Sequence, residues 1–149
     1  MVSRVQSEQL STDEAIAAVA DPAAGAIDVF LGVVRNNNKG RDVAYLEYDA
    51  YPEMAEKVMA NLGQEAVEQF GLQKVALYHR TGKLEISETS LLIAISAGHR
   101  AETFAAGKWL VDEVKKRVPV WKKEVWTDGE EWIEGPESLA LQRPGATGD

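Results

Sequence analysis

The sequence predicts an α+β fold: an antiparallel or mixed sheet with two main helices packed on it, followed by a C-terminal hairpin. Two observations lead to this prediction. Two long segments have apolar residues at helical spacing, and the segments around them resemble pairs of short strands. Strand pairs that alternate with helices are typical of α+β layouts and not of doubly wound sheets. The 149 residues match one domain, since domains usually run about 100–200 residues.

The first third of the chain predicts a short helix and two strands. Ser11 followed by Glu14 is a capping-box pattern, which begins a short helix. Residues 25–34 are mostly apolar with β-branched side chains, as in a buried strand. Residues 35–41 are polar and rich in Asn, which is typical of a loop. Residues 43–48 alternate apolar and polar side chains, so we expect a half-buried strand that pairs antiparallel with 25–34.

Two long helices are predicted in the rest of the chain. The first begins at Pro52, which suits a first helical turn, and ends at Gly71, a common left-handed terminator. Its expected core residues are Met54, Val58, Leu62, Val67 and Phe70. The second covers 101–117 and ends before Pro119, which cannot continue a helix. Its expected core residues are Phe104, Leu110 or Val111, and Val114.

The remaining strands follow from apolar runs and turn residues. Residues 74–79 predict a strand followed by a turn at 81–83, and the strongly apolar residues 90–97 predict a central strand. An Asp-Gly turn joins 120–127 to 130–134, as in a β-hairpin. We therefore expect one domain over residues 1–135. The last residues, 136–149, are rich in Pro, Gly and small side chains, and predict a flexible tail.

The composition excludes several kinds of chemistry. The chain has no cysteine, so disulfides, thiolate metal sites and a cysteine nucleophile are excluded. No metal-ligand cluster is visible, and no cofactor is expected. The net charge is −8, which disfavours general binding to nucleic acid. No apolar run is long enough to span a bilayer, and the N-terminus lacks a signal-like apolar core, so we expect a soluble, cytoplasmic protein.

Basic residues are segregated along this acidic chain. The groups are Arg35, Lys39 and Arg41; His79 and Arg80; His99 and Arg100; and Lys115, Lys116, Arg117, Lys122 and Lys123. Segregated positive charge indicates a local anion site. The alternative is that these are solvated surface charges, and the grouping alone does not separate the two.

Four segments combine such residues with a strand end or a helix end, where binding groups usually lie. Residues 30–38 deliver Arg35 and three amides into a loop, and Arg suits bidentate contact with phosphate or carboxylate. Residues 96–100 end a strand and open a helix, whose free N–H groups favour anions. Residues 114–124 place Lys115 and Lys122 on either side of a Pro turn that can bring them together, where a lysine can act as an acid/base or as an amine nucleophile.

Each of these segments also has a purely structural interpretation. The first is then a surface loop stabilised by Asn turns, the second a histidine that caps a helix, and the third a basic helix end before a solvated strand. The fourth segment, 79–82, offers His79 and Arg80 as a second anion contact, although a structural histidine at a strand end explains it better.

Five patterns stand in order along residues 25–134. They are F-x-G-x-V-R-N-x-N (30–38), H-R-x-G (79–82), A-x-H-R (97–100), K-x-R-x-P-x-W-K-x-E (115–124) and W-I-E (132–134). Each is weak alone, but the ordered set is specific. It resembles the large, catalytic subunit family of molybdopterin synthase, over most of the chain.

The resemblance implies an α/β hammerhead-like fold and a homodimer with one small ubiquitin-like subunit docked at each end, a heterotetramer. The small subunit ends in Gly-Gly, is activated as a thiocarboxylate, and threads its tail into a pocket of the large subunit. The implied sulfurtransferase reaction adds two sulfurs in succession to cyclic pyranopterin monophosphate, which forms the molybdopterin dithiolene in molybdenum cofactor biosynthesis. The absence of cysteine agrees with sulfur that arrives on a partner.

The resemblance also implies residue roles at the matching motif positions. Lys115 and Lys122 are then catalytic, with Lys115 nearest the thiocarboxylate. Arg35 is the basic residue beside them, and Phe30 lies on the pocket wall. Two further residues, His99 and Arg100, contact the pterin and its phosphate.

Two points in that comparison stay open. The protomer that supplies His99 and Arg100 is not fixed by the sequence, and a reach across the dimer is one arrangement. Some relatives carry an Arg where this chain has Pro136, so a substrate contact from the tail is in doubt.

Two functions of other classes use the same residues. A non-catalytic module could bind a phosphorylated small molecule or an acidic peptide tail with the same basic pocket. An RNA-binding α+β domain is disfavoured by the net charge of −8 and by the lack of aromatic residues interleaved with the basic groups.

Overall fold

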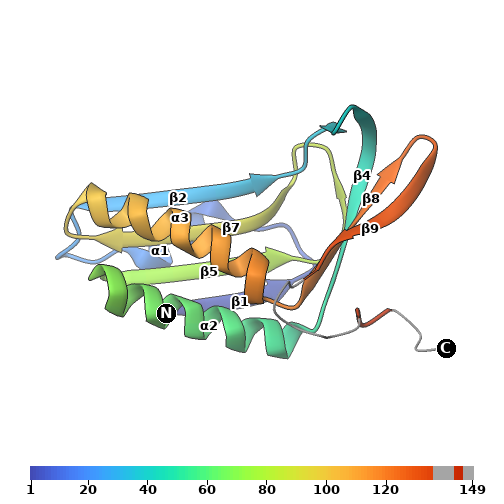
Figure 1. Cartoon of the computed structure of the whole chain (residues 1–149). Coiled ribbons are helices and arrows are strands. Elements are labelled where there is room, and N and C mark those ends of the chain that lie inside the picture. The colour runs from blue at the N-terminus through green and yellow to red at the C-terminus, as the bar shows by residue number, and fades with distance from the viewer. Residues whose placement is uncertain (136–142, 146–149) are drawn as a thin grey trace.

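The computed structural model describes residues 1–135 and 143–145, which form two sheets and three helices (Figure 1). In chain order the elements are β1 (Val2–Gln6), α1 (Thr12–Val19), β2 (Ala26–Val33), β3 (Asn37–Asn38), β4 (Arg41–Ala50), α2 (Pro52–Phe70), β5 (Lys74–Arg80), β6 (Gly82–Glu85), β7 (Thr89–Ala97), α3 (Arg100–Arg117), β8 (Val120–Trp126) and β9 (Gly129–Glu134). The predicted α+β class is confirmed.

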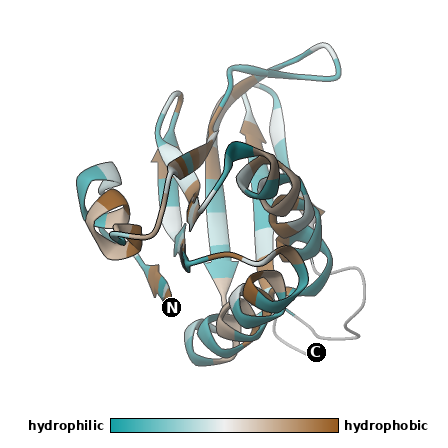
Figure 2. Ribbon diagram, turned by 90° about the vertical axis from the view of Figure 1, so that its left-hand side faces the viewer, coloured by the Kyte–Doolittle hydropathy of each residue, from teal (hydrophilic) through white to brown (hydrophobic). Residues whose placement is uncertain are grey.

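The first sheet has the strand order β1-β5-β7-β2. β1 runs parallel to β5, whereas β7 is antiparallel to both β5 and β2. Helix α1 covers one face, and α2 and α3 cover the other (Figure 2). All side chains of residues 90–97 are buried, which confirms the predicted central strand.

The main core lies between this sheet and the two long helices. Leu77 and Ile93 of the sheet pack with Met59, Leu62 and Leu110 of the helices, and all five are fully buried. Burial of a large aliphatic side chain contributes about 1.5–3 kcal/mol. This packing fixes the C-terminal end of α3 against the end of the sheet.

The second sheet has the order β3-β4-β8-β9, with β6 also paired to β4. It stands at a steep angle beyond one end of the first sheet (Figure 1). A small core of its own holds it there, formed by Val34, Val43, Leu46 and Leu84. β8 and β9 form the predicted C-terminal hairpin.

The predicted pairing of 43–48 with 25–34 is wrong. β2 pairs with β7, whereas β4 pairs with β8 in the second sheet. Val34 marks the crossing, because its backbone N–H donates to the Glu88 carbonyl and its carbonyl accepts from the Ser87 N–H. The loop after Val34 therefore carries the chain between sheets and does not fold back as a hairpin turn. β2 is left as an edge strand with partly exposed side chains, although its apolar sequence predicted burial.

The long helices begin and end where the sequence predicts, but their buried faces differ. Gly71 has the predicted left-handed conformation, with φ of 68°. Leu110 and Val114 of α3 are buried as expected, whereas Phe104 is 62% exposed. The face of α3 that meets the sheet also includes Thr103 and the small Ala106, and that register turns Phe104 outward. In α2 the buried face is Ala55, Met59, Leu62, Gly63 and Ala66, and Met54 is exposed.

Three short strands go beyond the prediction, since β3 also lies within the predicted loop 35–41, and the tail prediction is largely untested. β1 adds a parallel edge to β5, and β6 occupies the region expected to be a turn. Most of the predicted flexible tail, 136–149, lies outside the described residues. Within it, the Gly145 N–H donates to Asp49 Oδ2 at 2.9 Å, and Arg143 Nη1 lies 3.4 Å from the same oxygen.

Candidate active site

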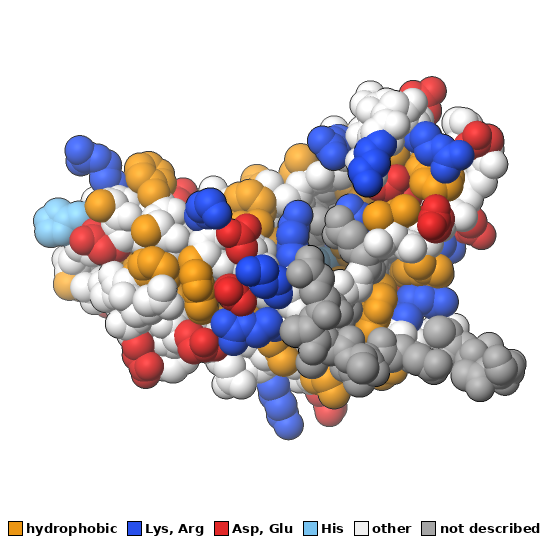
Figure 3. Space-filling model, in the orientation of Figure 1, with side chains coloured by type: hydrophobic (Ala, Val, Ile, Leu, Met, Phe, Trp, Pro, Cys, Tyr) orange, Lys and Arg blue, Asp and Glu red, His pale blue; other side chains and the backbone are white. Residues whose placement is uncertain are grey.

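A cavity of about 620 Å³ lies where the first sheet, the C-terminal end of α3 and the second sheet meet. Lys and Arg side chains gather around this junction on the face shown in Figure 3. The volume falls in the usual range of small-molecule sites, about 300–1,000 Å³. Four of the six predicted site residues line it: Phe30, Arg35, Lys115 and Lys122.

Phe30 and Arg35 reach the cavity from the end of β2. Phe30 is 38% exposed on the edge strand and forms an apolar part of the wall. Val34, buried and bonded to the 87–88 turn, anchors the segment from which Arg35 emerges. Arg35 Nη2 lies 3.4 Å from Asn38 Oδ1, and its side chain is otherwise exposed to the cavity and solvent.

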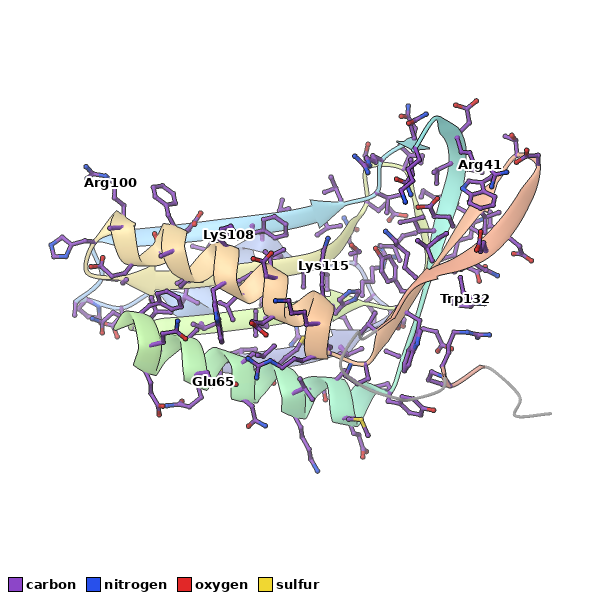
Figure 4. All side chains as sticks on the ribbon, viewed as in Figure 1. Arg41, Glu65, Arg100, Lys108, Lys115 and Trp132 are labelled. Carbon is purple, nitrogen blue, oxygen red and sulfur yellow. The ribbon has the colours of Figure 1, made fainter. Side chains whose placement is uncertain are left out.

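Lys115 and Lys122 reach the cavity from the two sides of the Pro119 turn. Lys115 lies in the last turn of α3 and points toward the space between the sheets (Figure 4). α3 ends at Arg117, the N–H of the C-cap residue Val118 donates to the Val114 carbonyl, and β8 begins at Val120. This short connection brings two lysines, seven residues apart in sequence, onto one cavity.

A buried carboxylate, which the sequence analysis did not single out, also lines the cavity. Glu124 is 3% exposed and accepts hydrogen bonds from Asn38 Nδ2 at 2.5 Å and Trp126 Nε1 at 2.8 Å. The bond to Asn38 ties β8 to the short β3. A period of two along β8 places Glu124 on the same side as Lys122, so strand alternation could have identified it.

By the same alternation, the side chain of Lys123 lies on the opposite face of β8. Its ammonium lies 2.9 Å from Glu47 and 3.0 Å from Glu130, and it does not line the cavity. Hydrogen bonds to Glu47 and then to Glu130 raise the pKa of Lys123. Of the basic cluster at 115–123, Lys115 and Lys122 line the cavity, as the Pro turn between them predicted, and Lys123 does not.

The two residues of the predicted anion contact, His79 and Arg80, lie in different environments. His79 lines the cavity and is 5% exposed, and burial lowers its pKa to about 4. Its ring is therefore neutral near pH 7 and adds no cation. Arg80 is held by Glu88 at 2.8 Å and by the Ser7 carbonyl at 3.0 Å, which is a structural role.

His99 and Arg100 lie away from the cavity within one chain. They stand at the N-terminal end of α3, whereas Lys115 lies near its C-terminal end (Figure 4). The rise of an α-helix separates Arg100 from Lys115 by about 22 Å. Both side chains are exposed, and His99 occupies the N-cap position of α3 but makes no side-chain capping bond.

The site is a cationic cavity with an apolar wall and one buried carboxylate. Within residues 1–135 and 143–145, no three His, Cys, Asp or Glu side chains cluster in a way that could hold a metal ion. No helix of the described part is both long and apolar enough to cross a membrane. Chemically, Arg35, Lys115 and Lys122 can bind anionic groups and stabilise negative charge that develops between them.

Known proteins share both the sequence and this fold. Residues 5–117 match the family described as MoaE protein. The molybdopterin synthase catalytic subunit of Pyrococcus abyssi is 48% identical over 136 residues, which cover 91% of this chain and 92% of that one. The crystal structure of molybdopterin synthase from Staphylococcus aureus is 38% identical, with a TM-score of 0.84 over 88% of this chain and 96% of that chain.

A more distant solved structure shares the fold alone. It is a protein–protein complex of subunits 1 and 2 of molybdopterin-converting factor from Helicobacter pylori, 21% identical, with a TM-score of 0.68 over 91% of this chain and 90% of that chain. The matched residues, 5–117, include α3 and most of the residues that line the cavity. The chain therefore belongs to the MoaE family, the family of molybdopterin synthase catalytic subunits.

Proposed function

We propose that this protein transfers sulfur from the C-terminal thiocarboxylate of a small ubiquitin-like subunit to cyclic pyranopterin monophosphate, forming the dithiolene of molybdopterin. The observation that carries the proposal is the convergence of Arg35, Lys115 and Lys122 on one cavity. Membership of the MoaE family supports the reaction. The two-subunit complex known from Helicobacter pylori supports a small-subunit partner.

The cavity has the charge that such a reaction requires. The donor tail and the substrate phosphate are both anionic, and two like charges 4 Å apart repel by about 4 kcal/mol at an effective dielectric near 20. Three cationic side chains around the same space offset this repulsion. The rest of the protein has an excess of acidic residues, so the cavity is a local exception to the net charge of −8.

The sulfur must enter on the partner because the chain has no cysteine. A thiocarboxylate sulfur is already a nucleophile and needs no side chain to activate it. For each sulfur delivered, a carbon–sulfur bond forms on the pterin while a carbon–oxygen bond of the same carbon breaks and that oxygen leaves. Water then breaks the acyl–sulfur bond, so the sulfur stays on the pterin and the tail leaves as a carboxylate. Lys115 orients the thiocarboxylate and assists proton transfer, while Lys122 and Arg35 stabilise the anionic intermediate and the phosphate.

A second copy of the chain completes the site in this proposal. β2 is an edge strand, and edge strands offer unpaired backbone groups to another chain. Apolar side chains are exposed along it and beside it on α3, namely Ile27, Phe30, Leu31, Val33 and Phe104. A groove of about 300 Å³ between β2 and α3 continues this surface, lined in part by Phe104 and Val111.

Two-fold symmetry about the middle of β2 would bring His99 and Arg100 to the partner's cavity. One end of β2, Ala26, pairs with Ala97, close to His99, and the other end, Val33, lines the cavity. An axis that sets the two β2 strands antiparallel places each end beside the opposite end of its partner. The eight-residue strand spans about 25 Å, similar to the separation of Arg100 from Lys115 along α3.

Reconstitution tests the proposed reaction directly. The protein is incubated with a thiocarboxylated small subunit and cyclic pyranopterin monophosphate, and the dithiolene product is measured. We expect Lys115→Ala to abolish conversion while the fold is retained, because the cation nearest the donor is lost. Lys116→Ala, on the same helical turn but outside the cavity lining, should retain activity. Binding of both ligands without product would instead support a non-catalytic binding module.

A further inference from the structure

His79 lines the cavity, but the proposed reaction assigns it no role. It lies on β5, one position before the strand ends, and only 5% of it is exposed. The other histidine of the chain, His99, stands exposed at the far end of α3. A buried imidazole on the wall of a cationic cavity therefore needs its own explanation.

The contacts of His79 determine which ring nitrogen can accept a hydrogen bond. Nδ1 lies 2.9 Å from the Arg80 carbonyl oxygen. A carbonyl can only accept, so Nδ1 carries the proton and donates, and Nε2 carries the lone pair. The ring also packs edge-to-face on Tyr48, with centroids 5.0 Å apart. Nε2 makes no hydrogen bond within residues 1–135 and 143–145.

His79 Nε2 is a neutral acceptor on a wall whose cationic side chains can only donate. Arg35, Lys115 and Lys122 present donors, and the Asn38 amide donates to Glu124. An extended peptide that enters the cavity loses water from its backbone N–H groups, and each buried N–H without a partner costs free energy. Because burial keeps the ring neutral, it does not compete with the cations for the anionic end of the peptide.

The neighbours of His79 favour a peptide without side chains. Leu91 pairs with His79 in the sheet, and Val114 and Val118 of α3 line the same cavity. These apolar side chains suit glycine and offer nothing to a phosphate. Val114 precedes Lys115, so a carboxylate or thiocarboxylate held by Lys115 would place its last peptide groups beside this apolar part of the wall.

We propose that His79 Nε2 accepts a hydrogen bond from the backbone N–H of one of the two terminal glycines of the small subunit's tail. His79 is thus a positioning residue that recognises the tail as a peptide, while Lys115 recognises its charge. This inference rests on the proposed function, because it takes the donor tail as the ligand.

A double-mutant cycle tests the bond. The probes are a small ubiquitin-like subunit with its native Gly-Gly carboxylate tail, and two versions made by peptide ligation in which either glycine is replaced by glycolic acid. An ester oxygen replaces the N–H in these versions and leaves the shape nearly unchanged. Affinity is measured by calorimetry for the full-length protein, for His79→Phe and for His79→Asn. Phe keeps the ring packing on Tyr48, and Asn can keep the bond to the Arg80 carbonyl.

We expect one of the two esters to weaken binding to the unsubstituted protein by about 3- to 10-fold, the usual value of a neutral hydrogen bond. The same ester should have no effect in whichever of the two His79 variants folds, as judged by circular dichroism. An ester effect that persists in the variants, or no ester effect at all, would overturn the inference while leaving the proposed function intact. Absence of binding even for the native tail would contradict the proposed function itself.

Discussion

At the scale of single residues, burial and pairing decide what each titratable side chain contributes. His79 is buried without a cation or a carboxylate as partner, so its neutral form is favoured. Lys123, close by in sequence to Lys122, is held by two carboxylates and serves the second sheet. Glu124 stays buried because two neutral donors satisfy it. Proximity in sequence to the cavity lysines therefore does not by itself imply a role in the site.

The low pKa of His79 predicts a pH dependence of stability. The pKa is about 4 in the folded protein and near 6.5 in an unfolded chain, so above pH 6.5 the ring is neutral in both states. As the pH falls below 6.5, only the unfolded chain takes up the proton, and the free energy of unfolding decreases. The loss should reach about 3 kcal/mol by pH 4 and grow no further below that.

Urea denaturation between pH 7 and pH 5 measures this effect in a range where few carboxylates titrate. His79→Phe should flatten the pH dependence, and His99→Ala, at the exposed histidine, is the matched control variant. If the free energy of unfolding of His79→Phe decreased between pH 7 and pH 5 as much as that of the unsubstituted protein, the buried neutral ring would not be the source of the decrease.

Part of the site could be predicted from the sequence, and part could not. Arg35, Lys115 and Lys122 were identified because basic residues at strand and helix ends form a recognisable pattern. The neutrality of His79 could not be predicted, because it depends on burial by residues distant in sequence. The distance of His99 and Arg100 from Lys115 could have been expected from the length of one helix. The sequence contains no signal for which protomer of the proposed dimer would supply them to a site.

At the scale of elements, the edge strand β2 has apolar side chains that its own chain does not cover. Its sequence resembles a buried strand, yet the single chain leaves four of its apolar side chains exposed: Ile27, Phe30, Leu31 and Val33. Phe104 on α3 is exposed beside them. A surface with this much exposed apolar area usually marks an interface.

Phe104→Asp should therefore separate the proposed dimer, because burying an unpaired carboxylate in an apolar interface costs several kcal/mol. Sedimentation velocity gives the measurement. Met54→Asp is a matched control, since Met54 is also an exposed apolar residue on a helix, but on α2 and away from β2. The proposed interface would be contradicted if the unsubstituted protein were a monomer, or if the Phe104→Asp variant stayed a dimer.

Helix positions could be predicted better than strand partners. Caps and terminators are local, and Pro52, Gly71 and Pro119 act through their own backbone, so both long helices were placed correctly. Strand pairing depends on distant segments. β1 pairs with β5, more than seventy residues away in sequence, and β4 pairs with β8 and not with β2. The exposed Phe104 was predicted as core because a large apolar side chain has the same pattern whether the covering surface belongs to its own chain or to another.

At the scale of the whole molecule, the cavity exists only because two sheets meet at the end of α3. Residues from β2, β4, β5, β7, α3 and β8 share it, so no single motif could form it. The acidic chain thereby has a cationic cavity that can bind an anionic tail and an anionic substrate. We propose that the cavity becomes a complete active site only when a second copy of the chain contributes the N-terminal end of its α3.

A mixing experiment tests that account most directly. Lys115→Ala and Arg100→Ala proteins, each inactive or strongly impaired alone, are unfolded together, refolded and assayed for dithiolene formation with the thiocarboxylated small subunit. If Lys115 and Arg100 of one site come from different protomers, a mixed dimer has one intact site. Random pairing then restores about one quarter of the unsubstituted activity. Activity no higher than that of the separate variants would contradict the shared site, since every site would then hold one of the two substitutions.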